Sequence, residues 1–320
     1  MTDLRNIYTK AAAVTASDST AYGTDGSPYF DALYLGDGNF EAGITASDLF
    51  DPKLWLKANA GVTDSGGAIS AWADQSGNSH NAAATNAPTV EAGVDATNGL
   101  ATIDFNPAGN DDGLKVTDHA DFDFSSAFEM AVLVKFDLVN ANRCVLSKDF
   151  YQNEWTWICD DGIMKFHVGG DDGIGSATLS TDTWYVVGIS RGAASRQIQL
   201  FLNGATDGSA VGNTQDLTGT NDLYIGQRFN DPGWSQGLDG EIAEILVWKA
   251  ELTSAQRAYV YTYLTDKWLN PQKADVAVKV DGVTTTLDKR AIGSIVEIFH
   301  ATRVMATKTN ATNIVALYKD

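Results

Sequence analysis

The sequence has few cysteines, few prolines and few basic residues for its length. Among 320 residues there are 2 Cys, 6 Pro and 22 Lys and Arg, against 41 Asp and Glu, and the formal net charge is −19. The two cysteines, Cys144 and Cys159, are too few for a disulfide framework and lack metal-ligand spacing. They could face each other across neighbouring strands, but we favour two buried free thiols.

Basic clusters and long apolar runs are missing as well. Because no run of Lys and Arg occurs, phosphate backbones and anionic lipid surfaces would be repelled, and we expect no nucleic-acid partner. No stretch reaches the roughly 18 apolar residues that a membrane span needs. Residues 1–20 also lack the apolar segment of a signal peptide. We therefore expect no membrane insertion.

Turn-forming residues and short apolar runs are abundant instead. There are 30 glycines, and 44% of the residues are hydrophobic. Residues 128–136 (FEMAVLVKF) alternate in the manner of a strand, and Asp160-Asp161-Gly162 separates two further alternating runs, which is a hairpin signal. Strands joined by tight turns predict an all-β fold.

Residues 238–268 combine one strand with one helix. The segment from Glu241 to Trp248 is rich in apolar residues, as in a strand buried between two sheets. Thr253 lies in a helix N-cap signal, and the residues after it form an apolar stripe that includes Tyr259 and Tyr261. We expect this pair of elements to complete the sheets formed by the preceding strands.

Several short motifs follow one another in a familiar order. They are LWLKANAGVT, WADQSGN followed by His80, ATIDF, QIQLFLNG and LYIG. Together with the strand and helix above, they resemble the concanavalin A-like lectin/glucanase sandwiches of the laminin-G-like branch, from Asp48 to Leu269. This resemblance implies a jelly-roll β-sandwich with Trp72 in its core and a structural turn at Asp74-Gln75-Ser76-Gly77.

The two ends of the chain resemble a different family. ALYLGDG near the N-terminus, ADVAVKV, and the segment from Val296 to Tyr318 are similar to the small spike-base domains of tailed phages and gene transfer agents. We therefore expect a split base domain of residues 1–45 and 272–320, with a lectin domain of residues 46–271 inserted between them. A base of this size would bury little core, so a symmetric homo-oligomer is expected.

Three carboxylates suggest hydrolysis, because glucanases of the same fold carry E-x-D-x-x-E on one bulged strand. Here Asp239, Glu241 and Glu244 form D-G-E-I-A-E, with Asp at the first position. A retaining pair needs about 5 Å between carboxyl groups, which Asp in place of Glu would disturb. We expect no enzyme, although a glycan-cleaving enzyme stays an alternative.

The string G-x-S-x-G at residues 188–192 matches the nucleophile elbow of hydrolases. That motif needs a turn from strand to helix and a histidine partner. The surrounding pattern is that of a β-hairpin arm, and His80, His119, His167 and His300 are scattered in the sequence. We interpret the string as a strand that leads into a turn.

Sugar recognition usually combines an exposed aromatic face with fixed planar polar groups. Two loops offer this combination, and for the loop around Trp234 both exposure and burial stay open. The candidates are Trp234, Asn230 and Asp231 in one loop, and Tyr151, Asn153, Trp155 and Asp171 in the other. Trp155 and Trp157 share one strand face, so both should be buried or both should line a surface.

Three acidic turns, at residues 110–113, 170–173 and 230–233, could supply oxygen ligands to Ca²⁺. None has the complete spacing of an EF-hand, and Asp or Asn before Gly is also ordinary turn chemistry. Calcium is the one cofactor that we consider, and no other is expected.

The resemblances imply a virion structural protein, either a head spike or a fibre. Its base would dock on the capsid or a vertex, and its lectin domain would bind host cell-surface glycan from the virion surface. The acidic composition suits a displayed, soluble module. The alternative within this class is a capsid or tail decoration protein that binds no glycan.

Overall fold

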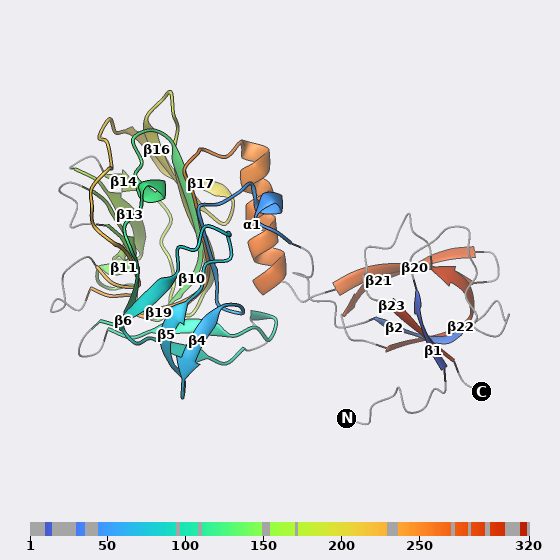
Figure 1. Cartoon of the computed structure of the whole chain (residues 1–320). Coiled ribbons are helices and arrows are strands. Elements are labelled where there is room, and N and C mark those ends of the chain that lie inside the picture. The colour runs from blue at the N-terminus through green and yellow to red at the C-terminus, as the bar shows by residue number, and fades with distance from the viewer. Residues whose placement is uncertain are drawn as a thin grey trace. The chain divides into compact units, whose positions relative to one another are not determined.

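The computed structural model divides the chain into two compact units. The structure describes residues 10–14, 30–35, 44–93, 97–107, 111–148, 154–169, 172–228, 236–269, 273–280, 283–291, 295–304 and 314–318. Met1–Gly43 and Pro271–Asp320 form one unit, which we call the terminal unit. Ile44–Asn270 form the other, which we call the central unit (Figure 1).

The terminal unit is one antiparallel sheet drawn from both ends of the chain. Its described strands are β1 (Lys10–Val14), β2 (Phe30–Leu35), β20 (Lys273–Val280), β21 (Val283–Ala291), β22 (Ile295–Val304) and β23 (Ile314–Tyr318). They lie in the order β1-β23-β2-β22-β20-β21. Leu33 lies opposite Val296 on one side and Ala316 on the other. The short strand β2 therefore pairs with strands about 260 to 280 residues further along the chain, as a single short strand requires.

The central unit is built from short antiparallel strands, as the turn-rich sequence predicts. The strands are β3 (Leu54–Lys57), β4 (Val62–Ser65), β5 (Ala68–Trp72), β6 (Ala82–Asn86), β7 (Thr89–Glu91), β8 (Thr102–Phe105), β9 (Gly113–Val116), β10 (Phe128–Phe136), β11 (Arg143–Ser147), β12 (Thr156–Asp160), β13 (Ile163–His167), β14 (Gly173–Ile174), β15 (Trp184–Arg191), β16 (Gln197–Leu202), β17 (Ala205–Gly212), β18 (Leu223–Ile225) and β19 (Gly240–Trp248). Asp160-Asp161-Gly162 connects β12 to β13, and Asp161 and Gly162 both have the positive φ of a tight hairpin turn.

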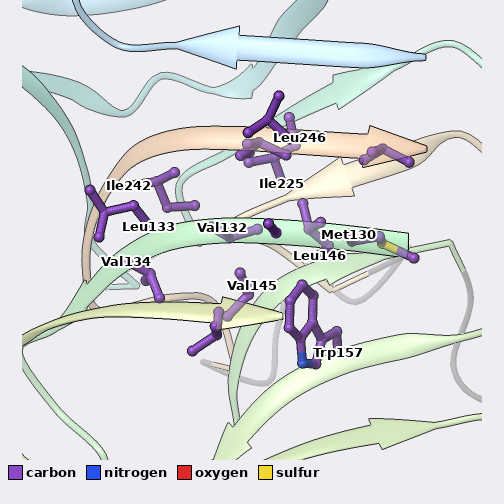
Figure 2. Packing of buried hydrophobic residues seen from close by; sticks show 14 of the residues in the cluster. Met130, Val132, Leu133, Val134, Val145, Leu146, Trp157, Ile225, Ile242 and Leu246 are labelled. Carbon is purple, nitrogen blue, oxygen red and sulfur yellow. The ribbon is translucent and has the colours of Figure 1, made fainter. Parts of the chain in front are cut away.

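The hydrogen-bonded strands of the central unit form two layers that pack face to face. This arrangement confirms the predicted all-β sandwich. β10 pairs with both β15 and β19, and β16 continues this layer. The other layer contains β18, β11, β12 and β13. Figure 2 shows the apolar core between them, where Val132 and Val134 of β10 lie near Val145 of β11 and Trp157 of β12.

The central strands β10 and β19 are covered on both faces. All nine residues of β19 are buried, and so are all of β10 except Lys135. The second layer covers their inner face, and α1 (Ser254–Trp268) covers their outer face. These strands therefore carry nearly continuous apolar runs rather than a strict alternation.

Helix α1 begins at the predicted N-cap. Thr253 accepts a hydrogen bond from the Gln256 N–H, and the Gln256 side chain accepts one from the Thr253 N–H, which is a capping box. The buried face includes Tyr261 and Leu264, but Tyr259 is 45% exposed, so its place in the apolar stripe was wrong. Tyr259 instead lies edge-on against Phe50.

Within the described residues, no helix is both long enough and apolar enough to cross a membrane.

Two local predictions are confirmed in the central unit. Trp72 is fully buried, and the Asp74 carboxylate accepts hydrogen bonds from the backbone N–H groups of Trp55, Ser76 and His80, which fixes the turn that follows. Cys144 and Cys159 are buried free thiols. Burial raises the pKa of both, that of Cys159 to about 12, so neither is a reactive thiolate near neutral pH.

Candidate functional site

The carboxylates of β19 lie beside a β-bulge, as they do in the glucanase pattern. Leu133 of β10 faces Glu244 and Val134 faces Ile242, so Ala243 is the extra residue. Glu241 accepts a hydrogen bond from the Thr102 hydroxyl and forms an ion pair with Lys135. The bulge therefore exists, but Glu241 is held between neighbouring strands.

Glu244 is enclosed between β19 and α1, with no exposed surface. Its Oε1 accepts hydrogen bonds from Trp55 Nε1 at 2.5 Å and Tyr263 Oη at 2.9 Å. Its Oε2 accepts from Lys267 Nζ at 2.5 Å and Trp268 Nε1 at 2.7 Å. Four donors saturate this carboxylate, and the lysine balances its charge. Glu244 therefore anchors the helix and has no contact with solvent through which a substrate could reach it.

A second buried carboxylate fixes the start of the same helix. Glu129 of β10 accepts two hydrogen bonds from Arg257, at 2.6 and 2.9 Å, and one from the Leu252 N–H. Burial raises the pKa of Glu129, and the Arg257 guanidinium opposes that shift. Helix α1 is thus attached to the sheet by an ion pair near each end.

The G-x-S-x-G string lies in a strand, as we interpreted it. Ser190 is a buried residue of β15 that pairs with Glu129 of β10 and Gln199 of β16. The strand ends at Arg191, and no helix follows it. Ser190 therefore lacks the strand-to-helix turn of a nucleophile elbow.

The sugar-binding prediction fails at Trp155. This side chain is 1% exposed and stacks on Phe166 with ring centroids 5.5 Å apart. Trp157 is buried as well, so the pair shares the core rather than a surface. The other predicted residues, Tyr151, Asn153, Asp171, Asn230, Asp231 and Trp234, lie outside the described residues, and their role stays a prediction.

The described parts of the acidic turns use their carboxylates for local hydrogen bonds. Asp111 accepts from the Gly237 N–H at 3.0 Å, and Asp112 accepts from the Asn106 N–H at 3.0 Å. Asp172 forms an ion pair with His167 at 2.9 Å. These contacts are ordinary turn chemistry, and calcium binding stays a prediction.

A hollow of about 530 Å³ lies between α1 and the turn that joins β16 to β17. Its walls are both polar and apolar, and its lining includes Asn203, Ala258, Tyr261, Thr262 and Asp266. The Tyr261 ring forms part of the lining, but its hydroxyl points to Gly188 of β15, where an added Cβ would lie 1.7 Å from it. The hollow, which we call the helix groove, has the size of a small-ligand pocket.

One cluster of side chains was not predicted from the sequence. His80 and His119 were treated as scattered, but the fold brings both rings to Asp121. The His80 and His119 ring centroids are 4.5 Å apart. No local signal joins these residues, because the contact depends on how the Asp74 turn packs against the 3-10 helix η4 (Ala120–Phe122).

These features define a two-layered antiparallel β-sandwich of the lectin type, with one helix packed on its outer face. A family model described as the concanavalin A-like lectin/glucanases superfamily (Laminin_G_3) matches residues 108–256. Residues 108–256 of the central unit are therefore similar to concanavalin A-like lectin/glucanase domains, in agreement with the all-β sandwich fold.

Solved structures of similar fold include binding domains of a mosquitocidal protein and of botulinum neurotoxins. The binding domain of Paraclostridial Mosquitocidal Protein 1 is 13% identical, with a TM-score of 0.55, and the match covers 76% of this chain and 65% of that one. The botulinum neurotoxin serotype D ligand binding domain, in complex with N-acetylneuraminic acid, is 13% identical at a TM-score of 0.52, with 78% and 64% covered. The binding domain of botulinum neurotoxin DC, in complex with rat synaptotagmin II, is 10% identical at 0.50, with 77% and 64% covered.

The match spans slightly less than two thirds of the length of each of these structures. At such identities the similarity is one of fold. No curated protein matches the chain.

Proposed function

We propose that the central unit binds carbohydrate. The observation that carries this proposal is its fold, a lectin-type sandwich similar to toxin binding domains, one of which was solved with N-acetylneuraminic acid. The predicted contact loop contains Trp234, Asn230 and Asp231, because an aromatic face beside planar polar groups suits the C–H and hydroxyl sides of a sugar ring. The helix groove is the second place where a sugar would fit.

We further propose that the domain binds glycan without cleaving it. Glycosidases need an acid and a second carboxylate on either side of the scissile bond, both within reach of substrate. Glu244 is fully buried and takes four hydrogen bonds from other residues, and Glu241 is paired with Lys135. Both carboxylates thus already have structural partners, which supports binding over hydrolysis.

Our proposal for the whole chain is a virion structural protein that displays this lectin domain. Two observations support it: the resemblance of both termini to spike-base domains, and the sheet that these termini form together. The terminal unit would dock on a capsid or vertex protein and assemble as a symmetric homo-oligomer. Several copies would convert weak single-site sugar binding into useful avidity at the virion surface.

A glycan array probed with the full-length chain tests the binding proposal. We expect a defined set of glycans to bind, and Trp234→Ala to abolish the signal. Tyr259→Ala is the matched control, because it removes an exposed aromatic ring from α1, on the surface away from the core. Thr262→Arg fills the helix groove and should leave binding unchanged.

The outcomes separate the candidate functions. Absence of binding to every glycan would favour a decoration protein that binds no sugar. Loss of binding only in Thr262→Arg would move the site to the helix groove. Release of free sugar from a bound glycan, abolished by Glu241→Gln, would make the protein an enzyme and overturn the proposal of binding without cleavage.

A further inference from the structure

Two histidines and one aspartate meet at the surface of the central unit, from segments 41 residues apart. His80 Nε2 lies 2.9 Å from Asp121 Oδ2, and His119 Nδ1 lies 3.3 Å from the same oxygen. The three potential ligand atoms all lie within 4.8 Å of one another. We call these residues the His-Asp cluster.

We propose that the His-Asp cluster binds one divalent transition-metal ion of the zinc class. Imidazole nitrogen and carboxylate oxygen are ligands that Zn²⁺ prefers, at about 2.0–2.2 Å. Two such ligands on a tetrahedral ion lie roughly 3.3–3.4 Å apart. The nitrogen-to-oxygen distances of 2.9 and 3.3 Å are close to that separation, so only small side-chain shifts would admit the ion.

The protein holds the ligands in place before any ion arrives. The Asp74 carboxylate accepts a hydrogen bond from the His80 N–H at 3.0 Å, and the His80 ring packs on Phe122 with centroids 4.9 Å apart. Asp121 belongs to η4, and His119 is its N-cap residue. Fixing ligands in advance lowers the entropy that metal binding must offset.

A hydrogen bond also makes one ring nitrogen of His119 an acceptor. The Asp121 N–H donates to His119 Nδ1 at 3.1 Å, so that nitrogen carries a lone pair rather than a proton. A metal ion requires the same unprotonated state. At His119 Nδ1 the ion would take the place of the Asp121 N–H donor. Between His80 Nε2 and Asp121 Oδ2 it would take the place of the hydrogen-bonding proton.

The cluster leaves coordination positions for other ligands. The His119 side chain is 53% exposed, whereas that of His80 is 10% exposed, so the ion would sit at the surface with one side facing solvent. Three protein ligands with an open position characterise zinc sites that exchange a water or an external ligand. The Lys53 ammonium also interacts with the Asp121 carboxylate. Its positive charge repels a metal cation, so we expect weaker zinc binding here than at a structural zinc site with four protein ligands.

Isothermal titration of untagged full-length protein with ZnCl₂ tests the site. We expect one ion per chain, and an affinity at least about tenfold lower in His119→Ala and His80→Gln, because each removes one ligand. His119→Asn keeps an N-cap acceptor for η4, so it separates loss of the metal from loss of the turn. The matched control is His167→Ala, which removes the histidine of the His167–Asp172 pair and should leave zinc affinity unchanged.

Three results would overturn the proposal. They are the absence of zinc binding up to about millimolar metal, equal affinity in His119→Ala and the unmodified chain, and an equal loss of affinity in His167→Ala. Thermal melts in chelator should show the same stability for His119→Asn and the parent chain. An increase in melting temperature with ZnCl₂ in the parent alone would support the site.

Discussion

Replacement of Glu244 by leucine should strongly destabilise the central unit. The substitution removes the carboxylate that faces Lys267, and that lysine side chain is 1% exposed. Breaking a buried ion pair by removing one partner costs about 3–5 kcal/mol. Trp55 Nε1 and Trp268 Nε1 lose the acceptor that they now share, which adds about 1–3 kcal/mol for each buried donor. We expect a loss of about 5 kcal/mol or more, a large fraction of the 5–15 kcal/mol typical of a domain.

The partner substitution should cost less. Lys267→Met leaves Glu244 with its hydrogen bonds from Trp55, Tyr263 and Trp268, so the carboxylate keeps three of its four donors. In the double variant no charge remains in the site, so the combined loss should be smaller than the sum of the two single losses. A coupling energy of about 1–3 kcal/mol is expected from the double-mutant cycle.

Urea denaturation followed by tryptophan fluorescence measures this cycle. All eight tryptophans of the sequence lie in the central unit, so the signal reports that unit. Asp216→Asn is the control, because Asp216 is 65% exposed and its 3.1 Å pair with Arg196 is a surface pair worth about 0–1 kcal/mol. A loss below about 1 kcal/mol in Glu244→Leu, or strictly additive effects in the double variant, would refute the anchoring role.

Three further predictions concern burial in the central unit. Burial and neighbouring carboxylates raise the pKa of Asp104 from 3.8 to about 6. Between about pH 4 and 6, Asp104 is therefore protonated in the folded state but ionised in the unfolded state. Stability should fall across that window as pH rises, and Asp104→Asn should lessen the fall in denaturation curves at pH 4 and pH 7. Gly188→Ala should lower the free energy of unfolding by about 1–3 kcal/mol, because the added Cβ would overlap the Tyr261 hydroxyl. Adding Tyr261→Phe should restore most of that stability. A double variant as unstable as Gly188→Ala alone would contradict this contact. Cys144 and Cys159 should react with a thiol reagent only after unfolding, and rapid labelling of the native chain would show that they are accessible.

Local chemistry made the fold class and the helix boundary predictable. Glycine-containing turns such as Asp161-Gly162 and the capping residue Thr253 act within a few residues, so the sequence pattern contains the whole signal. The burial of β19 was also visible in its apolar content, but residues 128–136 were predicted as an alternating strand, and the pattern did not reveal that a helix covers the second face of β10 and β19.

The site was less predictable, because its contacts join distant residues. The string D-G-E-I-A-E resembles a set of catalytic carboxylates when only the sequence is considered. The structural role of Glu244 depends on hydrogen-bond donors such as Trp55, which lies 189 positions away in the sequence. Trp155 was chosen for a loop surface, yet Phe166 and the second layer bury it. His80 and Asp121 meet only because two turns pack together, and no spacing rule covers such a pair.

A crystal structure of the full-length chain, soaked with the glycan that binds most tightly on the array, would show whether the central unit binds sugar. We expect sugar density on the central unit, with one ring stacked on Trp234 and intact glycosidic bonds. Density for no sugar at saturating concentration, or for sugar bound only to the terminal unit, would contradict it.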